Sequence, residues 1–193
     1  MAAVMLSIRP KWCEMIASGK KTIEVRKTRP KLDTPFKCYI YETKGIAEIG
    51  HNGDVAYVYH EGRGKVIGEF VCNEIREITT VFRNERGEII TKCDGNIWDH
   101  QLLPHYSCLS AKEICYYLGG IAKNGYGWQI SELTIYDMAR KLPEFNRCEH
   151  TGKDSEACRH CRYGPLHSQE KSYCIGKPIY RPPQSWCYVK EVG

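Results

Sequence analysis

The sequence of 193 residues contains no apolar run long enough to cross a bilayer, and residues 1–10 lack the apolar stretch of a secretory signal peptide. Both absences predict a cytoplasmic protein without a membrane partner. Internal repeats are also missing, which excludes a repeat architecture. Helical spacing of apolar residues recurs in only two stretches. This argues against parallel α/β layering, which needs more crossover helices.

A disulfide framework is not expected either, although the chain contains 11 cysteines. An odd cysteine number without an export signal is typical of a reducing compartment. Many of the cysteines lie among apolar residues, where a free thiol behaves as a small core side chain. These are Cys13, Cys38, Cys72, Cys108 and Cys115.

The charge balance gives only a weak indication of a partner. The chain has a net charge of +5, with 42% hydrophobic and 26% charged residues. These fractions are ordinary for a globular protein. The length suits one domain with a sizeable core, or one domain plus an appendage. A mildly basic balance is compatible with a nucleic acid or nucleotide as partner and does not require one.

Apolar patterning predicts several short strands and two helices. The first helix begins at Pro10 and ends at Gly19, and the second runs from Ser110 to Leu118 with Glu113 in a capping box. Strands are expected at residues 5–8, 22–26, 38–41, 65–72, 127–136 and 186–189, a loop at 44–54 and irregular chain at 83–106. These elements predict an α+β fold built on a small β-barrel with short flanking helices.

The most informative stretch is Gly19–Arg26, where a glycine precedes two lysines, a threonine, a glutamate and an arginine. Gly19 is expected to end the first helix in a left-handed conformation, and the β-branched residues after it favour a strand. Alternation then predicts two faces, one with Thr22, Glu24 and Arg26 and the other with Lys21, Ile23 and Val25. A row of polar groups suits the lining of a polar pocket, and a solvated edge strand is the alternative.

Three side chains of this stretch are candidate catalytic groups. A desolvated Lys21 would act as a base or nucleophile, and Glu24 would orient a water molecule or transfer protons. Arg26 would hold a phosphate or a carbonyl through its planar guanidinium group. In the alternative interpretation, Glu24 and Arg26 form one ion pair that holds the strand, and Lys21 is solvated.

Aromatic side chains offer surfaces on which a base would stack, although most are expected in the core. Trp12 and Trp128 are the two candidates for ligand contact. Arg9 and Thr22 complete the predicted substrate-binding set.

The segment 146–178 is polar, rich in cysteine and interrupted by Gly and Pro. Its predicted metal ligands are Cys148, Cys158, Cys161 and Cys174. The two-residue gap between the middle pair lets both thiolates reach one tetrahedral ion, and a metal would supply the stability that a core cannot. We expect a structural Zn²⁺, with His150 or His167 as possible replacements for a cysteine ligand. Basic residues suggest that the segment also helps to hold nucleic acid. The alternative is a loop without metal.

The stretch Leu6–Trp12, the helix after it and the pattern Gly-x-Lys-x-x-Glu-x-Arg at residues 19–26 resemble the signature of the ASCH domain. This family belongs to the PUA-like group of small β-barrels. Residues 65–75 resemble the following barrel strand. Segments 129–137 and 181–186 resemble phage and prophage members. The resemblance covers about residues 4 to 142 and the tail.

The resemblance implies a pocket in the barrel wall for a nucleobase or nucleoside, and an association with RNA. Some members hydrolyse the acetyl amide of N4-acetylcytidine, and others have been described as ribonucleases. In the amidohydrolases, a lysine at the position of Lys21 acts with a threonine at the position of Glu24 and with a later glutamate. Because this chain departs from the pattern at Glu24, the role of the threonine is not carried over. Candidates for the third catalytic group are Glu69, Glu74, His105 and Glu113.

Together these observations predict a PUA-like barrel domain at 1–145, a cysteine-rich zinc-binding insertion at 146–178, and a strand within 179–193 that returns to the barrel. The predicted function is binding of RNA or a modified nucleoside, with hydrolysis of an acyl amide or of RNA as the candidate activities. The first alternative is a non-catalytic RNA-binding module with a structural zinc knuckle. The second is a structural or interaction protein of phage origin whose pocket is vestigial.

Overall fold

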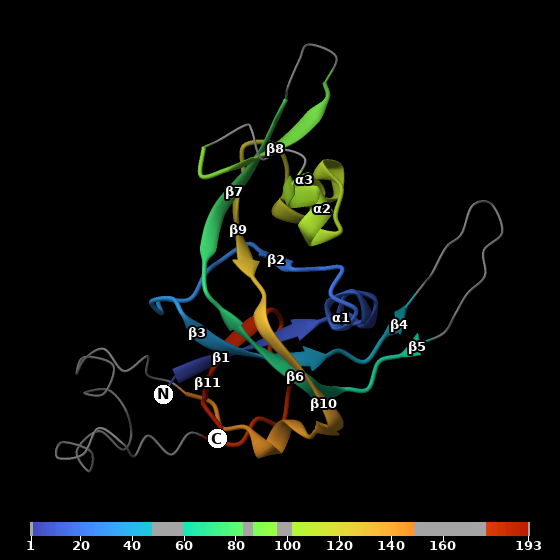
Figure 1. Ribbon diagram of the computed structural model, residues 1–193, viewed down its shortest axis with the longest axis vertical. Helices are drawn as coiled ribbons and strands as arrows, with labels where there is room; N and C mark the ends of the chain where they lie inside the picture. Colours follow the sequence, from blue (N-terminus) through green and yellow to red (C-terminus); the bar gives the residue numbers. More distant parts are fainter. Residues whose placement is uncertain (1, 48–59, 83–86, 96–101, 149–176, 193) are drawn as a thin grey trace.

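The computed structural model describes residues 2–47, 60–82, 87–95, 102–148 and 177–192. Most of these residues form two β-sheets with three short α-helices beside them (Figure 1). The mixed α+β class predicted from the sequence is therefore confirmed.

The larger sheet has five strands in the order β10-β6-β3-β1-β11. Its central strands, β1 (Ala2–Ile8) and β3 (Phe36–Glu42), run parallel to each other, and the other pairs are antiparallel. The remaining strands are β6 (Lys65–Cys72), β10 (Ser131–Arg140) and β11 (Trp186–Lys190). Because β11 pairs with β1, the two ends of the described chain meet in one sheet.

The smaller sheet has four antiparallel strands in the order β2-β9-β7-β8. They are β2 (Ile23–Arg26), β9 (Asn124–Gln129), β7 (Ile75–Phe82) and β8 (Ile89–Cys93). A separate pair consists of β4 (Ile46–Ala47) and β5 (His60–Glu61).

Two of the passages of the chain between the larger and the smaller sheet are short corners. One corner lies between β6 and β7, at residues 73–74, and the other is Ile130 between β9 and β10. The Gln129 N–H donates to the carbonyl of Glu74 at 3.0 Å, and the Ile130 N–H donates to the carbonyl of Thr22 at 2.9 Å. These bonds hold both corners beside the start of β2.

Helices cover the sheets where apolar faces need partners. Helix α1 (Pro10–Ala17) buries Cys13 and Ile16 against the inner face of the larger sheet, next to Trp128. Helices α2 (Leu102–Ser107) and α3 (Ala111–Leu118) cover the outer face of the smaller sheet, and a 3₁₀ turn (Leu142–Glu144) lies on the other face of the larger one. The predicted capping box of α3 is present.

Three expectations from the sequence are corrected. The described strands form open sheets and not a closed barrel, because the ladders do not continue across the corners. The single strand expected at 127–136 is two strands in different sheets, separated at Ile130. The irregular chain expected at 83–106 contains β8 and the beginning of α2. In the described part of the chain, no helix is long and apolar enough to span a membrane.

Candidate functional site

The predicted catalytic residues meet in a buried ionic cluster on the inner face of β2. One Glu24 oxygen lies 3.2 Å from the ammonium of Lys21, and the other lies 2.9 Å from the Arg26 guanidinium. The exposed fractions of Lys21, Glu24 and Arg26 are only 2%, 7% and 6%. Glu24 therefore joins two cations inside the protein, and Lys21 is not solvated as the alternative interpretation expected.

Both cations of this ionic cluster also donate to backbone carbonyls. The Lys21 ammonium donates to Ile23 at 2.9 Å and to Ser107 at 2.7 Å, so its three protons all have acceptors when Glu24 is included. The Arg26 guanidinium donates to the Ser7 carbonyl at 2.8 Å and to the Ser185 carbonyl at 3.2 Å. The ionic cluster thus links β2 to α2, β1 and the segment before β11.

Local geometry explains which way each side chain points. Gly19 adopts φ +72° after α1, as the sequence predicted, and the Lys21 N–H then donates to Met15 in the last turn of α1. The Thr22 N–H donates to the Tyr106 carbonyl of α2. Because Lys21 and Thr22 precede β2, they do not follow its alternation. Lys21 joins the face of Glu24, and Thr22 lines a pocket with Ile23; the predicted faces were wrong for these two residues.

Three buried donors close to this ionic cluster have no hydrogen-bond partner among the described residues: Arg26 Nε, Ser107 Oγ and Trp128 Nε1. The Ser107 carbonyl accepts from Lys21, and Trp128 is the register partner of Glu24 across β2 and β9. Unpartnered buried polar groups are unfavourable, so an acceptor brought to this place would be stabilised.

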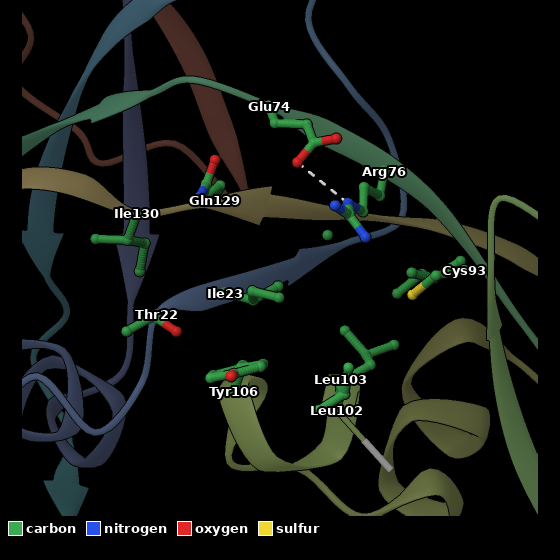
Figure 2. A pocket seen from close by; sticks show the side chains of 12 residues that line it. Thr22, Ile23, Glu74, Arg76, Cys93, Leu102, Leu103, Tyr106, Gln129 and Ile130 are labelled. Atoms are coloured by element: carbon green, nitrogen blue, oxygen red, sulfur yellow. Dashed lines mark ion pairs between the residues drawn. The ribbon is translucent and has the colours of Figure 1, made fainter. Parts of the chain in front are cut away.

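A pocket of about 470 Å³ lies at the start of β2, on the face of the smaller sheet that α2 covers. Apolar side chains from α2, β2 and β7 form much of its wall, and Gly127 lies in its β9 wall. Its polar lining residues are Thr22, Glu74, Arg76, Tyr106 and Gln129. Figure 2 shows Leu103 and Tyr106 of α2 on one side of this space and Glu74, Arg76 and Gln129 on the other. The volume is within the range of small-ligand sites.

The pocket and the ionic cluster use opposite faces of β2. Lys21, Glu24 and Arg26 do not line the pocket. On the side of the pocket opposite α2, the Arg76 guanidinium lies 3.1 Å from the Glu74 carboxylate, and both side chains are about half exposed. Tyr106 has 41% of its surface exposed, which is unusual for a ring beside a core. The pocket therefore combines an apolar wall, one accessible ring and a charged rim.

The predicted substrate-binding residues are not all together. Thr22 lines the pocket. Arg9 is exposed at the N-cap of α1, and half-buried Trp12 has Lys11 at 4.9 Å and Lys21 at 5.3 Å from its ring. Trp128 is completely buried and packs edge-on against Phe36, so its position does not support the expected stacking on a base.

Among the candidates for a third catalytic group, only Glu74 lines the pocket. Glu69 accepts from Tyr136 and Lys37 on the larger sheet, and Glu113 accepts from Ser110 in the capping box of α3. His105 is exposed on α2 and packs edge-on against Tyr106.

Of the four predicted zinc ligands, Cys148 is half-buried, and Cys158, Cys161 and Cys174 lie outside the described residues, as do His150 and His167. The described part of the chain contains no cluster of three or more His, Cys, Asp or Glu side chains that would hold a metal. The zinc site therefore stays a prediction. Burial raises the pKa of the thiols of Cys13 and Cys38 well above the usual range.

Sequence reasoning missed most of the pocket. Leu102, Leu103 and Tyr106 lie on a six-residue helix that contains Pro104, which is too short for a helical period to be seen. Gln129 and Ile130 were assigned to one continuous strand, although they form the corner. The signal that was available is the apolar pair Leu102–Leu103 followed by an aromatic residue one turn later.

Comparison with known proteins agrees with the sequence pattern. A sequence model of the ASCH domain matches residues 6–127, which is more than half of the chain. The crystal structure of ASCH from Zymomonas mobilis is similar with a TM-score of 0.54 at 16% identity, covering 98% of this chain and 88% of that one. A mutant of the Zymomonas mobilis protein gives 0.52 at 15% identity, covering 98% and 91%.

At these identities the structures show a shared fold. The chain matches none of the curated proteins. The phage or prophage character expected from the tail stays a prediction. From the matched residues, the chain belongs to the ASCH domain family.

Proposed function

We propose that this protein binds RNA or a modified nucleoside, with one base held in the pocket beside β2. The observation that carries the proposal is the position of this pocket of about 470 Å³, whose wall includes Thr22 and Ile23 of the ASCH signature. A base with its ribose fits a site of this size class.

The lining residues match the chemistry of a base. The accessible ring of Tyr106 offers a stacking surface, and the amide of Gln129 has both a donor and an acceptor for a base edge. Arg76, at the rim with Glu74, is placed to meet a phosphate or a ribose hydroxyl. The apolar wall from α2 and β7 excludes water around the base.

Binding without turnover is the activity that this geometry favours. Lys21, the predicted base or nucleophile, already has acceptors for all three ammonium protons and does not line the pocket. An ammonium held in this way has no lone pair for attack. The same ionic cluster supports the position of β2, and through β2 the wall of the pocket.

Hydrolysis of an acyl amide is the second candidate, and one observation favours it. The unpartnered donors Ser107 Oγ, Arg26 Nε and Trp128 Nε1 lie beside Lys21 and Glu24, where donors would stabilise the oxyanion of a tetrahedral intermediate. This activity requires the substrate to reach the buried ionic cluster rather than the pocket alone.

One experiment tests both candidates. The purified protein is titrated with a panel of unmodified, methylated and acylated ribonucleosides, and each mixture is analysed by calorimetry and by mass spectrometry. We expect saturable binding without a change in ligand mass, and a loss of affinity of at least about fivefold in Tyr106→Ala, since stacking on an aromatic ring contributes roughly 1–3 kcal/mol per base. Tyr180→Ala, at an exposed tyrosine remote from the pocket lining, is the matched control.

The outcomes separate the candidates clearly. Loss of an acyl group that is abolished in Ser107→Ala would establish the hydrolase, because this hydroxyl has no described partner whose loss would disturb the fold. Absence of any nucleoside binding, at low as well as high salt, would contradict the proposed function.

We further propose that the cysteine-rich segment binds a structural Zn²⁺ through Cys148, Cys158, Cys161 and Cys174. One observation supports this: the Arg147 N–H donates to the Lys177 carbonyl at 2.9 Å, so described residues on either side of 149–176 are joined. The sequence between them has few apolar residues, and such a segment gains stability from a metal. Elemental analysis should find one zinc per chain and none in Cys158→Ser; a metal-free wild type would contradict the proposal.

A further inference from the structure

The exposed side of α3 is unusual among the described helices because it presents two neighbouring tyrosines to solvent. Tyr116 has 90% of its surface exposed and Tyr117 has 37%. Ile114, Cys115 and Leu118 of the same helix are buried against the smaller sheet. The packing of α3 therefore does not require a ring at position 116.

Lysines lie beside each of these rings. The ammonium of Lys27 is 5.5 Å from the centre of the Tyr117 ring. Exposed Lys112 precedes Tyr116 by four residues, which places it one turn away on the same side of α3. Aromatic rings and lysines thus lie side by side on this surface. The lysines interrupt the apolar area, so the described residues do not form the continuous apolar patch that marks a protein-binding site.

The start of α1 continues this surface. The ammonium of Lys21 lies 5.3 Å from the Trp12 ring centre and donates to the Ser107 carbonyl, which joins the start of α1 to the chain just before α3. Hydrogen bonds from Ser110 lower the pKa of Glu113 in the first turn of α3, and the charge of Lys11 acts in the same direction. Lys11 also lies 4.9 Å from the ring centre of half-buried Trp12. Glu113 brings a negative charge, but its carboxylate accepts from the Ser110 N–H and hydroxyl. We name Lys11, Trp12, Lys27, Lys112, Tyr116 and Tyr117 the α1–α3 face.

We propose that the α1–α3 face binds single-stranded RNA that flanks the base held in the pocket. This rests on the proposed function only in the placement of that one base. Rings interleaved with lysines are the surface on which single strands bind, because bases stack on the rings and phosphates pair with the ammonium groups. The net charge of +5 acts in the same direction. Helix α2 connects the two sites along the chain, since Tyr106 lines the pocket and only residues 108–110 separate α2 from α3.

The test measures how RNA binding depends on the length of the RNA, on the salt concentration and on two side chains of the α1–α3 face. Fluorescence anisotropy measures binding of a 12-nucleotide single-stranded RNA at several salt concentrations to the wild type, Tyr116→Ala and Lys112→Gln. Tyr180→Ala is the matched control, since that tyrosine is 75% exposed and does not belong to the face. Binding of a single nucleoside is measured on the same samples.

We expect Tyr116→Ala to weaken binding of the 12-mer by at least about fivefold and to leave nucleoside affinity unchanged. Lys112→Gln should reduce the slope of log affinity against log salt by about 0.7, the value for one phosphate contact on a single strand. Equal affinities of all variants for the 12-mer would overturn the proposal and leave a protein partner for this face. If the wild type binds no nucleoside but the 12-mer still depends on Tyr116, the pocket assignment fails and the α1–α3 face stands.

Discussion

The two faces of β2 are built in opposite ways, although the strand is only four residues long. On the inner face, Glu24 and Arg26 are buried and their charges are paired with each other and with Lys21. On the outer face, Ile23 borders a pocket that the side chains of the described residues do not fill. One strand thus carries a buried cluster of paired charges and a pocket back to back.

This difference shows how a conspicuous motif and a binding site are related here. The charged residues of the signature hold α1, α2 and β1 around β2, because they donate to carbonyls in several elements. The pocket is formed by less conspicuous residues that this arrangement brings together, such as Tyr106 and Gln129. The motif therefore acts on the pocket largely by positioning its wall.

The largest expected effect on stability comes from disrupting the ionic cluster on the inner face of β2. Glu24→Ala would leave the ammonium of Lys21 and the guanidinium of Arg26 buried without their shared carboxylate. Removal of one partner from a buried ion pair costs about 3–5 kcal/mol, so we expect the free energy of unfolding in urea to fall by that amount. Glu74→Ala is the control: it removes a half-exposed pair with Arg76, and a change below about 1 kcal/mol is expected. A similarly small loss for Glu24→Ala would mean that water reaches the ionic cluster, contrary to the comparison drawn here.

A second prediction compares the buried ionic cluster with a partly exposed network on the larger sheet. There, burial opposes ionisation of Glu69, but hydrogen bonds from Tyr136 and Lys37 outweigh it and lower the pKa of the carboxyl below 4.5. A lowered pKa in the folded state means that this stabilisation is complete above pH 4.5 and is lost as the pH falls through the folded pKa. Glu69→Gln should cost about 1 kcal/mol at pH 7, where hydrogen bonds to the carboxylate are lost.

The readout for Glu69 is the difference in urea midpoint between wild type and Glu69→Gln, measured at pH 7 and at pH 3. We expect the difference to shrink at pH 3, because the wild-type carboxyl takes up a proton as the pH falls through its folded pKa. A constant difference at both pH values would show that the network does not depend on the charge of Glu69.

The sequence predicted those elements whose signals are local. Pro10 at the start of α1, Gly19 after it and the Ser110–Glu113 capping box each act through neighbouring backbone groups, and each lies where it was expected. The mixed α+β class also follows from local patterns. These features need no knowledge of how distant segments meet.

The predictions that failed concern features that depend on contacts between residues far apart in the sequence. Apolar residues continue through Ile130, so nothing in the local pattern separates β9 from β10; the turn is set by the bond from Ile130 to Thr22, more than 100 positions earlier. The pocket exists only because α2, a six-residue helix interrupted by Pro104, is held against β2. The burial of Lys21 likewise depends on the carbonyl of Ser107.

The smallest expected effect on stability comes from the outer face, at Gly127. A methyl group there would lie 3.1 Å from Ile23 and 3.8 Å from Ile78 and Leu103, in the wall of the pocket. Reduced freedom of the unfolded chain offsets the close contact, so Gly127→Ala should change the free energy of unfolding by less than about 0.5 kcal/mol. Nucleoside affinity should fall roughly tenfold, because one added carbon in a fitted pocket has an effect of this size.

Gly125→Ala on the same strand provides the matched comparison. Its methyl group would lie 2.4 Å from Leu118 and 3.1 Å from the Arg26 carbonyl, under α3 and away from the pocket lining. Overpacking of this kind costs about 1–3 kcal/mol, so this variant should lose stability, as measured in urea. If Gly127→Ala loses as much, the space beside Gly127 is not open, and the contrast between the two faces of β2 does not hold. If it keeps its stability and loses affinity, the outer face is the binding face, whatever the role of the ionic cluster behind it.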